Sequence, residues 1–336
     1  MLFGHTPGSV TPIDGVPIKH IKSQAWDGGL PMATGDDDGD VGESVWSRRL
    51  QKGPRFSVAL GWGSGQLVEA FWRDVFSTTR PGSSLLEIGC GSGDVSVWAA
   101  EAGRGLRIIA SDVHDNPEGV RQHPDVRFVG GVRAEALPFP PDAFDVVISN
   151  FAIEYSDDRE AALGELARVL RPGGCAALVL HSGDSVLSAT SWRIIQTQEM
   201  LVEAQVPDRL RRALALRPDH LSRRKLLKDL VKLGQQLSLP GLRYSGVEYF
   251  GIAERLLRGD PAAQQDLAEL EDALAMRLEI SRAQSRVALD AQGLVRLENQ
   301  SRARGLTAHT SELTCTYETS VTEKVGWIAL ATKAAG

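Results

Sequence analysis

The first half of the chain combines two kinds of hydrophobic pattern. Short apolar runs without polar alternation predict strands that are buried on both faces, as in a parallel sheet. These runs are at 84–88, 106–111, 126–129, 144–149 and 176–181. Apolar residues at helical spacing predict helices at 58–76, 94–101 and 158–170, with a turn at the GWGSG segment of the first. The alternation of strands and helices predicts a doubly wound α/β sheet.

The second half is dominated by helical periodicity, from residue 185 to about residue 304. Asp260 and Pro261 are residue types preferred at the cap and first turn of a helix, so they predict the start of a long one. Two strand-like runs at 306–316 and 325–332 then predict a hairpin that completes the sheet. We therefore interpret the helical stretch as an insertion into the α/β fold.

The N-terminal residues 1–42 are rich in glycine, proline and aspartate and show no sustained periodicity, which predicts an irregular arm. Four aspartates at 36–40 lack the ligand spacing of a calcium loop, so we expect a solvated acidic turn there. The imidazoles of His5 and His20 could reach a site if the arm closes over it, although surface histidines in an irregular arm are usually inert.

Composition narrows the class of protein. The 336 residues are 42% hydrophobic and 24% charged, with a net charge of -6, so no overall bias favours nucleic acid or anionic membranes. Cys90, Cys175 and Cys315 are far apart and odd in number, which favours a reducing compartment and gives no metal-site spacing. Neither a signal peptide nor a run of roughly 18 apolar residues is found. We expect a cytoplasmic protein without a metal or a membrane partner.

A glycine-rich turn carries the most specific chemical information. The segment LLEIGCGSGD at 85–94 is an apolar strand that runs into this turn and then into a helix. Glycines let a ligand approach the backbone, and the helix N-terminus offers free N–H groups. The dinucleotide fingerprint G-x-G-x-x-G, counted from Gly89, requires a glycine where this chain has Asp94, which argues against NAD and flavins.

Two acidic residues near this turn indicate the ligand's other parts. Glu87 precedes Gly89 by two positions and suits a ligand with a cationic amino group, such as that of methionine. Asp112 closes the second strand, where a carboxylate can accept both hydroxyls of a ribose. In register with the glycine turn, Asp112 is interpreted as a ribose ligand rather than as the cap of a loop.

The ordered motifs LLEIGCGSG, SDVHD, AEALPF, FDVVISNFAIEY and LRPGG resemble those of class I S-adenosylmethionine-dependent methyltransferases and together cover about residues 84–181. The resemblance implies a Rossmann-like methyltransferase fold, that is, a doubly wound, mostly parallel seven-stranded sheet, here with a helical insertion in the C-terminal half. It also implies S-adenosylmethionine as the cofactor and S-adenosylhomocysteine as its product.

The resemblance assigns cofactor contacts to residues on these motifs. Residues at the methionine end would be Glu87, Gly89, Cys90, Gly91 and Gly93; those at the ribose and adenine, Asp112, Val113, Ala134 and Glu135; those beside the sulfur, Asn150 and Phe151. Two features depart from the family. Arg133 stands where many relatives have an adenine-binding aspartate, so Glu135 or a main-chain carbonyl would replace it. Residues 114–125 leave little room for the usual helix between the second and third strands.

Methyl transfer from a sulfonium needs mainly alignment and desolvation, so a catalytic base is optional. His181, at the predicted end of the fifth strand, is the candidate base, with a structural role as the alternative. Glu154 and Tyr155 follow the fourth strand and would orient an acceptor hydroxyl or amine, or cap the next loop.

The domain organisation expected from these assignments has four parts. Residues 1–50 would form an irregular arm or lid, and residues 51–182 the S-adenosylmethionine-binding Rossmann-like core. Residues 183–290 would be a helical insertion that forms the acceptor pocket or a dimer surface. Residues 291–336 would return to the core with a final helix and a β-hairpin. The apolar stripe at 256–294 would pair two subunits if the protein is a homodimer.

The acceptor is left open by the sequence. The segment 205–232 carries nine basic and three acidic residues, which suits a solvated helical face, an anionic small molecule or, as a weaker alternative, RNA. Nucleic acid is disfavoured because this segment lacks interleaved aromatic residues and 150–153 does not match the Asn-Pro-Pro-Tyr type of motif. A small-molecule methyltransferase is the leading hypothesis. A methyltransferase acting on RNA or protein and a non-catalytic cofactor-binding module are the alternatives, and the methylated atom is undetermined.

Overall fold

The computed structural model describes residues 62–115, 121–236, 247–316 and 322–335. The predicted arm at 1–50, with its acidic turn and its histidines, lies outside these residues. The described residues form two compact units. One runs to Leu187 and resumes at Val287, and the other comprises Ser188–Arg286.

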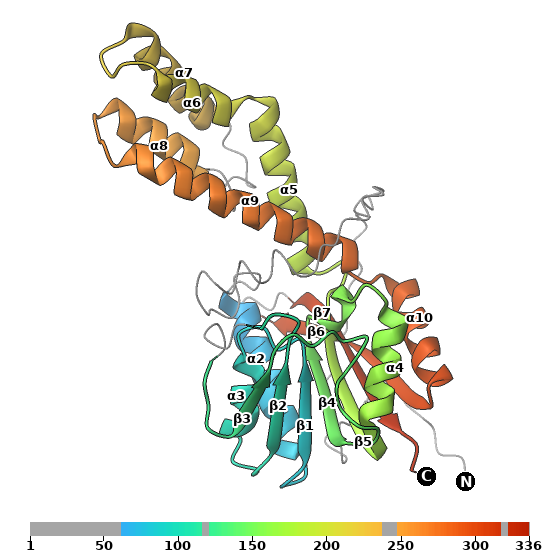
Figure 1. Ribbon diagram of the computed structural model, residues 1–336. Helices are drawn as coiled ribbons and strands as arrows, with labels where there is room; N and C mark the ends of the chain where they lie inside the picture. The colour runs from blue at the N-terminus through green and yellow to red at the C-terminus, as the bar shows by residue number, and fades with distance from the viewer. Residues whose placement is uncertain (1–61, 116–120, 237–246, 317–321, 336) are drawn as a thin grey trace. The chain divides into compact units, whose positions relative to one another are not determined.

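The first unit is built on a seven-stranded sheet with the order β3-β2-β1-β4-β5-β7-β6 (Figure 1). Strands β1 to β5 pair in parallel, whereas β7 pairs antiparallel with both β5 and β6. The strands are β1 (Ser84–Ile88), β2 (Arg107–Ser111), β3 (Val126–Val129), β4 (Phe144–Asn150), β5 (Leu170–Leu180), β6 (Leu306–Thr316) and β7 (Thr322–Lys333). The predicted doubly wound, mostly parallel seven-stranded sheet is confirmed.

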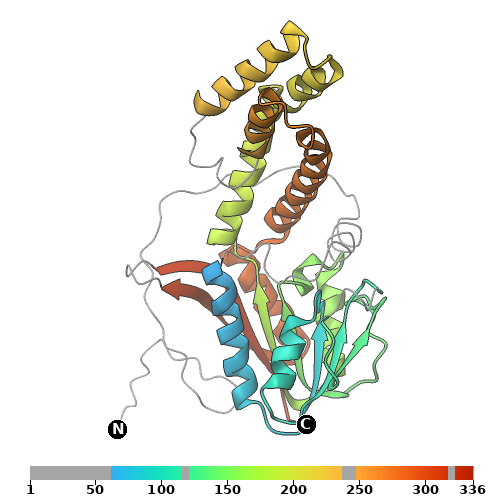
Figure 2. The ribbon, with the colours of Figure 1, turned by 90° about the vertical axis from the view of Figure 1, so that its left-hand side faces the viewer.

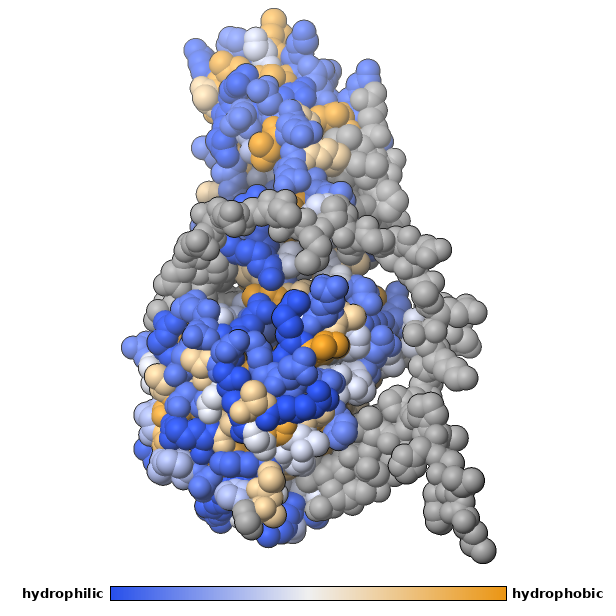
Figure 3. All heavy atoms as spheres, turned by 90° about the vertical axis from the view of Figure 1, so that its right-hand side faces the viewer, coloured by the Kyte–Doolittle hydropathy of each residue, from blue (hydrophilic) through white to orange (hydrophobic). Residues whose placement is uncertain are grey.

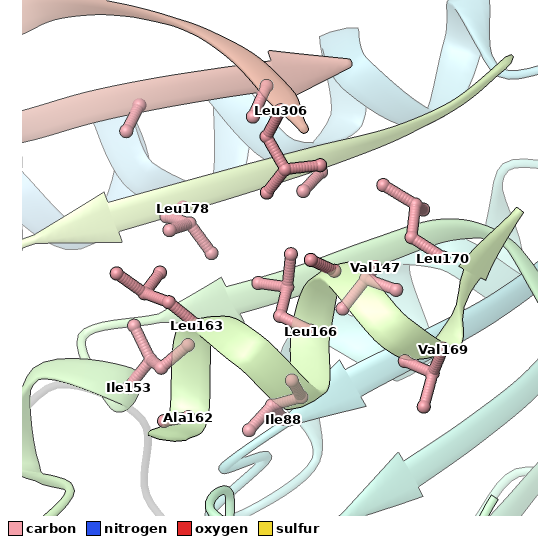
Figure 4. Packing of buried hydrophobic residues seen from close by; sticks show 14 of the residues in the cluster. Ile88, Val147, Ile153, Ala162, Leu163, Leu166, Val169, Leu170, Leu178 and Leu306 are labelled. Atoms are coloured by element: carbon pink, nitrogen blue, oxygen red, sulfur yellow. The ribbon is translucent and has the colours of Figure 1, made fainter. Parts of the chain in front are cut away.

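Helices cover both faces of this sheet. Helices α2 (Trp62–Thr78) and α3 (Asp94–Glu101) pack on one face, and α4 (Arg159–Val169) and α10 (Ala291–Ala303) on the other (Figures 1 and 2). Successive strand residues alternate between the faces, so Leu85 lies in the α2 and α3 core while Leu86 lies in the α4 and α10 core. Figure 4 shows part of the latter core, where Leu163 and Leu166 of α4 pack with Leu178 of β5. The apolar strands are therefore buried on both sides, as their pattern predicts. On the surface, by contrast, hydrophilic residues surround scattered apolar ones (Figure 3).

One expectation about a turn is wrong. The predicted turn at 61–65 is the first turn of α2 from Trp62 onward, because burial of residues such as Trp72 and Phe76 outweighs the roughly 1 kcal/mol that a helical glycine costs. Helix α4 ends at Val169, one residue before its predicted end. The strand that follows is longer than predicted, because β5 begins at Leu170, which pairs with β4, rather than at residue 176.

Helix α4 begins at a side-chain cap. The carboxylate of Asp158 accepts a hydrogen bond from the backbone N–H of Ala161 at 2.9 Å. Asp158→Ala is expected to lower the free energy of unfolding by about 1 kcal/mol, measured by urea denaturation. Asp157→Ala is the matched control, because Asp157 does not cap the helix and makes an exposed ion pair with Arg133. Equal losses in the two variants would contradict the assignment of the cap.

The second unit is helical. Its helices are α5 (Val186–Glu203), α6 (Val206–Ala215), α7 (Leu221–Gln236), α8 (Val247–Leu257) and α9 (Ala263–Val287). Helix α9 begins two residues after Pro261, and Asp260 accepts a hydrogen bond from the N–H of Ala262. Leu256, Leu267 and Leu274, which belong to the stripe expected to pair two subunits, are buried in this unit's own core. A homodimer stays a prediction. Among the described residues, no helix is both long and apolar enough to cross a membrane.

Candidate cofactor and acceptor site

The turn after β1 adopts a conformation that glycine favours. Gly89, Gly91 and Gly93 have φ angles of +70°, +52° and +77°. The N–H groups of Gly89 and Cys90 both donate to the carbonyl of Ser111, at 2.9 and 3.0 Å, which holds the turn against the end of β2. A Cβ on Gly91 would meet nothing within 4 Å, so the backbone there is open to a ligand. The burial of Cys90 raises the pKa of its thiol.

Gly89 differs from Gly91 because it is packed. A Cβ added to Gly89 would lie 2.4 Å from the Cβ of Ala152, directly after β4. Gly89→Ala is expected to reduce the free energy of unfolding by about 2 kcal/mol, since the strain of a left-handed alanine adds to the steric overlap. Gly131→Ala is the control, because Gly131 also has a φ of +70° but has open space around its Cβ position. Denaturation curves that show equal losses would mean that the contact with Ala152 is unimportant.

Asp112 lies against the glycine turn. Its carboxylate accepts hydrogen bonds from the N–H groups of Gly91 at 2.7 Å and of His114 at 3.2 Å. The backbone of Asp112 is itself bonded to Val129 and Val132, so the carboxylate is held in place. Its residue remains 9% exposed. Two positions 21 residues apart in the sequence therefore meet at the carboxyl ends of β1 and β2, where ligands of open α/β sheets bind.

His114 is a site residue that the sequence analysis did not single out. Its Nε2 lies 3.2 Å from the carbonyl oxygen of Gly91, and its ring stacks on Phe128. Asp112 and His114 thus hold the two ends of the glycine turn's central residue, one at its N–H and the other at its C=O. His114 stands inside the SDVHD motif, two positions after Asp112, so the signal was present in the sequence.

Glu87 is buried beneath the turn. It is 1% exposed, and the hydroxyl of Ser96 in α3 is bonded to its carboxyl at 2.5 Å. Burial raises the pKa of Glu87 to about 8, against the smaller opposing effect of the Ser96 bond. The carboxyl therefore ties β1 to α3, and it is largely protonated at neutral pH. Its contact with the cofactor's amino group stays a prediction.

Of the predicted adenine-side residues, Glu135 lies at the start of α4. Glu135 accepts a hydrogen bond from the N–H of Asp158 at 3.4 Å, and Arg133 lies 3.7 Å from its carboxylate. Ala134 packs against the core between the sheet and α4, and Val113 is half-buried after Asp112. Residues 116–120, in the middle of the connection between β2 and β3, lie outside the described residues, so the expectation of little room for a helix there stays a prediction.

The end of β4 is shaped by Asn150 and Phe151. The side-chain oxygen of Asn150 accepts a hydrogen bond from the indole N–H of Trp72 in α2 at 2.9 Å. Phe151 has a φ of +51°, which is uncommon for a residue with a side chain and is found disproportionately at functional sites. The ring of Phe151 lies 4.5 Å from that of His181, centroid to centroid. This strained residue therefore connects β4 to the residue that follows β5.

The three predicted catalytic residues, His181, Glu154 and Tyr155, lie together, and the ring of His181 also contacts Phe151. His181 Nδ1 lies 2.8 Å from Glu154 Oε1, which also accepts the backbone N–H of His181 at 3.0 Å. In the tautomer of His181 that donates from Nδ1 to this carboxylate, Nε2 carries the lone pair. The ring of Tyr155 lies edge-on to His181 at 5.6 Å, and burial raises the pKa of Tyr155 well above its ordinary value.

The described residues contain no group of three or more His, Cys, Asp or Glu side chains that could hold a metal ion. The site consists instead of an open glycine turn with an adjacent carboxylate and a buried carboxylate–imidazole pair. An open glycine backbone next to an acceptor for hydroxyl groups fits a ligand that combines an amino acid with a nucleoside.

Comparison with known proteins agrees with this geometry. Residues 86–178 match the family model of the methyltransferase domain. The ubiquinone/menaquinone biosynthesis C-methyltransferase UbiE of Vibrio parahaemolyticus is 34% identical over 123 residues, which are 34% of this chain and 47% of that protein. The UbiE of a Shewanella species, strain ANA-3, is 32% identical over 118 residues, 32% of this chain and 47% of that one. The chain spans about half the length of the curated relatives it matches.

Among solved structures, the YcgJ protein of Bacillus subtilis is similar with a TM-score of 0.34 and 18% identity, covering 81% of this chain and 99% of that one. The matched family model, over residues 86–178, is that of a methyltransferase domain, and the strand order, the glycine turn and the carboxylate at the end of β2 agree with the class I S-adenosylmethionine-dependent methyltransferase fold. The matched part, residues 86–178, lies wholly within the first unit, and S-adenosylmethionine is the cofactor that this domain implies.

Proposed function

We propose that this protein transfers the methyl group of S-adenosylmethionine to a small organic acceptor. The observation that carries the proposal is the Asp112 carboxylate held 2.7 Å from the N–H of Gly91, in a turn whose backbone is open. The glycine turn would hold the methionine part, Asp112 the ribose, and Val113 and Ala134 the adenine. The bound cofactor supplies a methyl group that its positively charged sulfur activates.

The acceptor side is assigned to the residues after β4 and β5. Nε2 of His181 would take a proton from an acceptor hydroxyl or amine, while Glu154 holds the imidazole in the required orientation. The rings of Phe151 and Tyr155 lie against His181 and would exclude water from that proton transfer. The name of the UbiE relatives supports a small acceptor, since it describes C-methylation in quinone biosynthesis.

Local ion pairs in the basic segment at 205–232 favour a small-molecule acceptor over a polymeric one. Part of its charge is already compensated, because Arg211 pairs with Asp208 and Glu271, and Arg217 pairs with Asp219. Arg223 donates to the carbonyl of Leu216. Such local pairing is typical of a solvated helical face, whereas a nucleic-acid surface keeps cations available for phosphates.

The test is a calorimetric titration of the full chain with S-adenosylmethionine, S-adenosylhomocysteine and NAD. An acceptor screen with methyl-labelled cofactor follows, read by mass spectrometry. We expect the two adenosyl-sulfur ligands to bind, NAD not to bind, and label to appear in a small molecule. Cofactor binding with no labelled product would favour the non-catalytic module. Label on RNA or protein, lost at high salt, would favour the polymer alternative.

A further inference from the structure

The first unit contains a cavity beside the pair of Glu154 and His181. Its volume is about 110 Å³, and it is lined by η2 (Ile153–Tyr155), α4, the end of β5 and α10. The apolar walls include Ile153 and Leu163, which lie side by side in Figure 4. An engineered apolar cavity of about 150 Å³ binds benzene, so this cavity suits a small organic molecule.

Polar groups on the cavity wall are incompletely paired. Glu154 is 3% exposed, and its Oε1 accepts from His181, but its Oε2 has no hydrogen-bond partner among the residues that the structure describes. Arg159 donates from Nε to the backbone carbonyl of Glu154 at 2.9 Å. Burial lowers the pKa of Arg159, and the charge of Glu154 opposes this effect. A buried carboxylate oxygen without a donor is destabilising, and a ligand that donates a hydrogen bond to it would remove this cost.

A second cation adds to this wall. Arg296, from α10, also lines the cavity, and its nearest carboxylate, that of Asp290, is 3.9 Å away. The cavity therefore presents two guanidinium groups, one carboxylate and leucine side chains. Guanidinium groups pair with carboxylates through planar, two-pronged hydrogen bonds. Glu154 Oε2, as an acceptor, requires a hydroxyl or ammonium donor.

We propose that this cavity binds a small carboxylic acid that also carries a hydroxyl or amino group. The ligand's carboxylate lies between Arg159 and Arg296, its donor bonds to Glu154 Oε2, and its short aliphatic part contacts the leucines. Because the other oxygen of Glu154 holds His181 Nδ1, occupancy of the cavity changes the hydrogen bonding of His181. The ligand class follows from the cavity alone and does not depend on methyl transfer.

The experiment is a calorimetric titration without cofactor, using 2-hydroxyisovalerate, 3-hydroxybutyrate and valine as probes. At least one acid is expected to bind, and the amide that replaces its carboxylate is expected to bind at least roughly 10-fold more weakly, a loss equivalent to one charge-assisted contact. Arg159→Met and Arg296→Gln are each expected to weaken binding by a similar factor. Arg296 has a 66% exposed side chain, so its replacement tests the site without disturbing the fold. Arg302→Gln is the control on the same helix, because Arg302 bonds to Glu298 and Asn299.

The proposal is overturned if no acid binds at millimolar concentration, if acids and amides bind equally, or if Arg302→Gln weakens binding as much as Arg296→Gln. Imidazole NMR adds a second readout. The bound hydroxy acid is expected to shift the His181 signals, which His181→Gln identifies, whereas isovalerate, without the hydroxyl, shifts them less. Unchanged His181 signals with the acid bound would refute the bond to Glu154.

Adding methyl-labelled S-adenosylmethionine shows whether the bound acid is the acceptor or an effector. A methylated probe identifies the acid as the acceptor, whereas binding without methylation identifies it as an effector. Both outcomes support the proposed ligand class of the cavity. Failure of the proposed methyl transfer would show separately, as loss of adenosyl-ligand binding or absence of any labelled product, with acid binding intact.

Discussion

Asp112→Ala is expected to weaken the binding of S-adenosylmethionine and S-adenosylhomocysteine at least roughly 100-fold. The carboxylate accepts the N–H of Gly91 and would also accept the ribose hydroxyls. Hydrogen bonds to a charged group contribute about 1.5–3 kcal/mol each, and about 1.4 kcal/mol corresponds to a factor of ten in affinity. The loss of two such bonds gives the expected factor. Calorimetric titration of the wild type and the variant measures it.

Two further variants make this result interpretable. Asp115→Ala removes an exposed carboxylate three residues further along the same loop and is expected to bind both ligands as the wild type does. Asp112→Asn keeps an oxygen for the N–H of Gly91, so it separates the loss of charge from a distortion of the turn. Unchanged affinity in Asp112→Ala would contradict the ribose assignment, and binding of NAD in place of the adenosyl-sulfur ligands would contradict the cofactor.

Glu87 is expected to make the stability of the protein depend on pH. Burial raises the pKa of Glu87 to about 8 in the folded state, above the ordinary value of 4.5 that applies when the chain is unfolded. Between these values the folded state holds a proton that the unfolded state has lost, so stability is highest near pH 5 and falls as the pH rises toward 8. The slope contributed by this one group is roughly 1.4 kcal/mol per pH unit, or about 4 kcal/mol from pH 5 to pH 8.

Glu87→Gln tests this expectation because glutamine keeps the shape of a protonated glutamate and does not titrate. The free energy of unfolding, from urea denaturation at several pH values, is expected to depend less on pH in the variant than in the wild type. Glu160→Gln, at an exposed position on α4, is the control and is expected to follow the wild type. Parallel curves for the wild type and Glu87→Gln would show that Glu87 is ionised in the folded state.

Much of the core was predictable because its signals are local. The bounds of β1, α3, β3 and β6 coincide with the predicted ranges, since an apolar run followed by glycines or charged residues defines where a buried strand or helix ends. The glycine turn and Asp112 were predictable for the same reason. Chain order places both at the carboxyl ends of neighbouring parallel strands, so no distant contact has to be known.

Local signals failed where packing determined the outcome. The glycines near the start of α2 predict a turn, but the burial of Trp72 and Phe76 extends the helix through them. The apolar run predicts a strand that begins at residue 176, but pairing with β4 begins β5 at Leu170. In both cases a tertiary contact outweighs a local preference of about 1 kcal/mol per residue.

The sequence by itself determined the class of fold, the glycine turn and the acidic residue beside it, because the alternation of strands and helices and the residue types of the turn can be recognised from neighbouring residues. Only the tertiary structure decided which side chains meet across long separations. Trp72 bonds to Asn150, 78 residues away, and Glu154 bonds to His181, 27 residues away. The unpaired oxygen of Glu154 and the cavity beside it were likewise decided by tertiary packing. Such contacts depend on how helices pack across the sheet, which no local pattern of residues records.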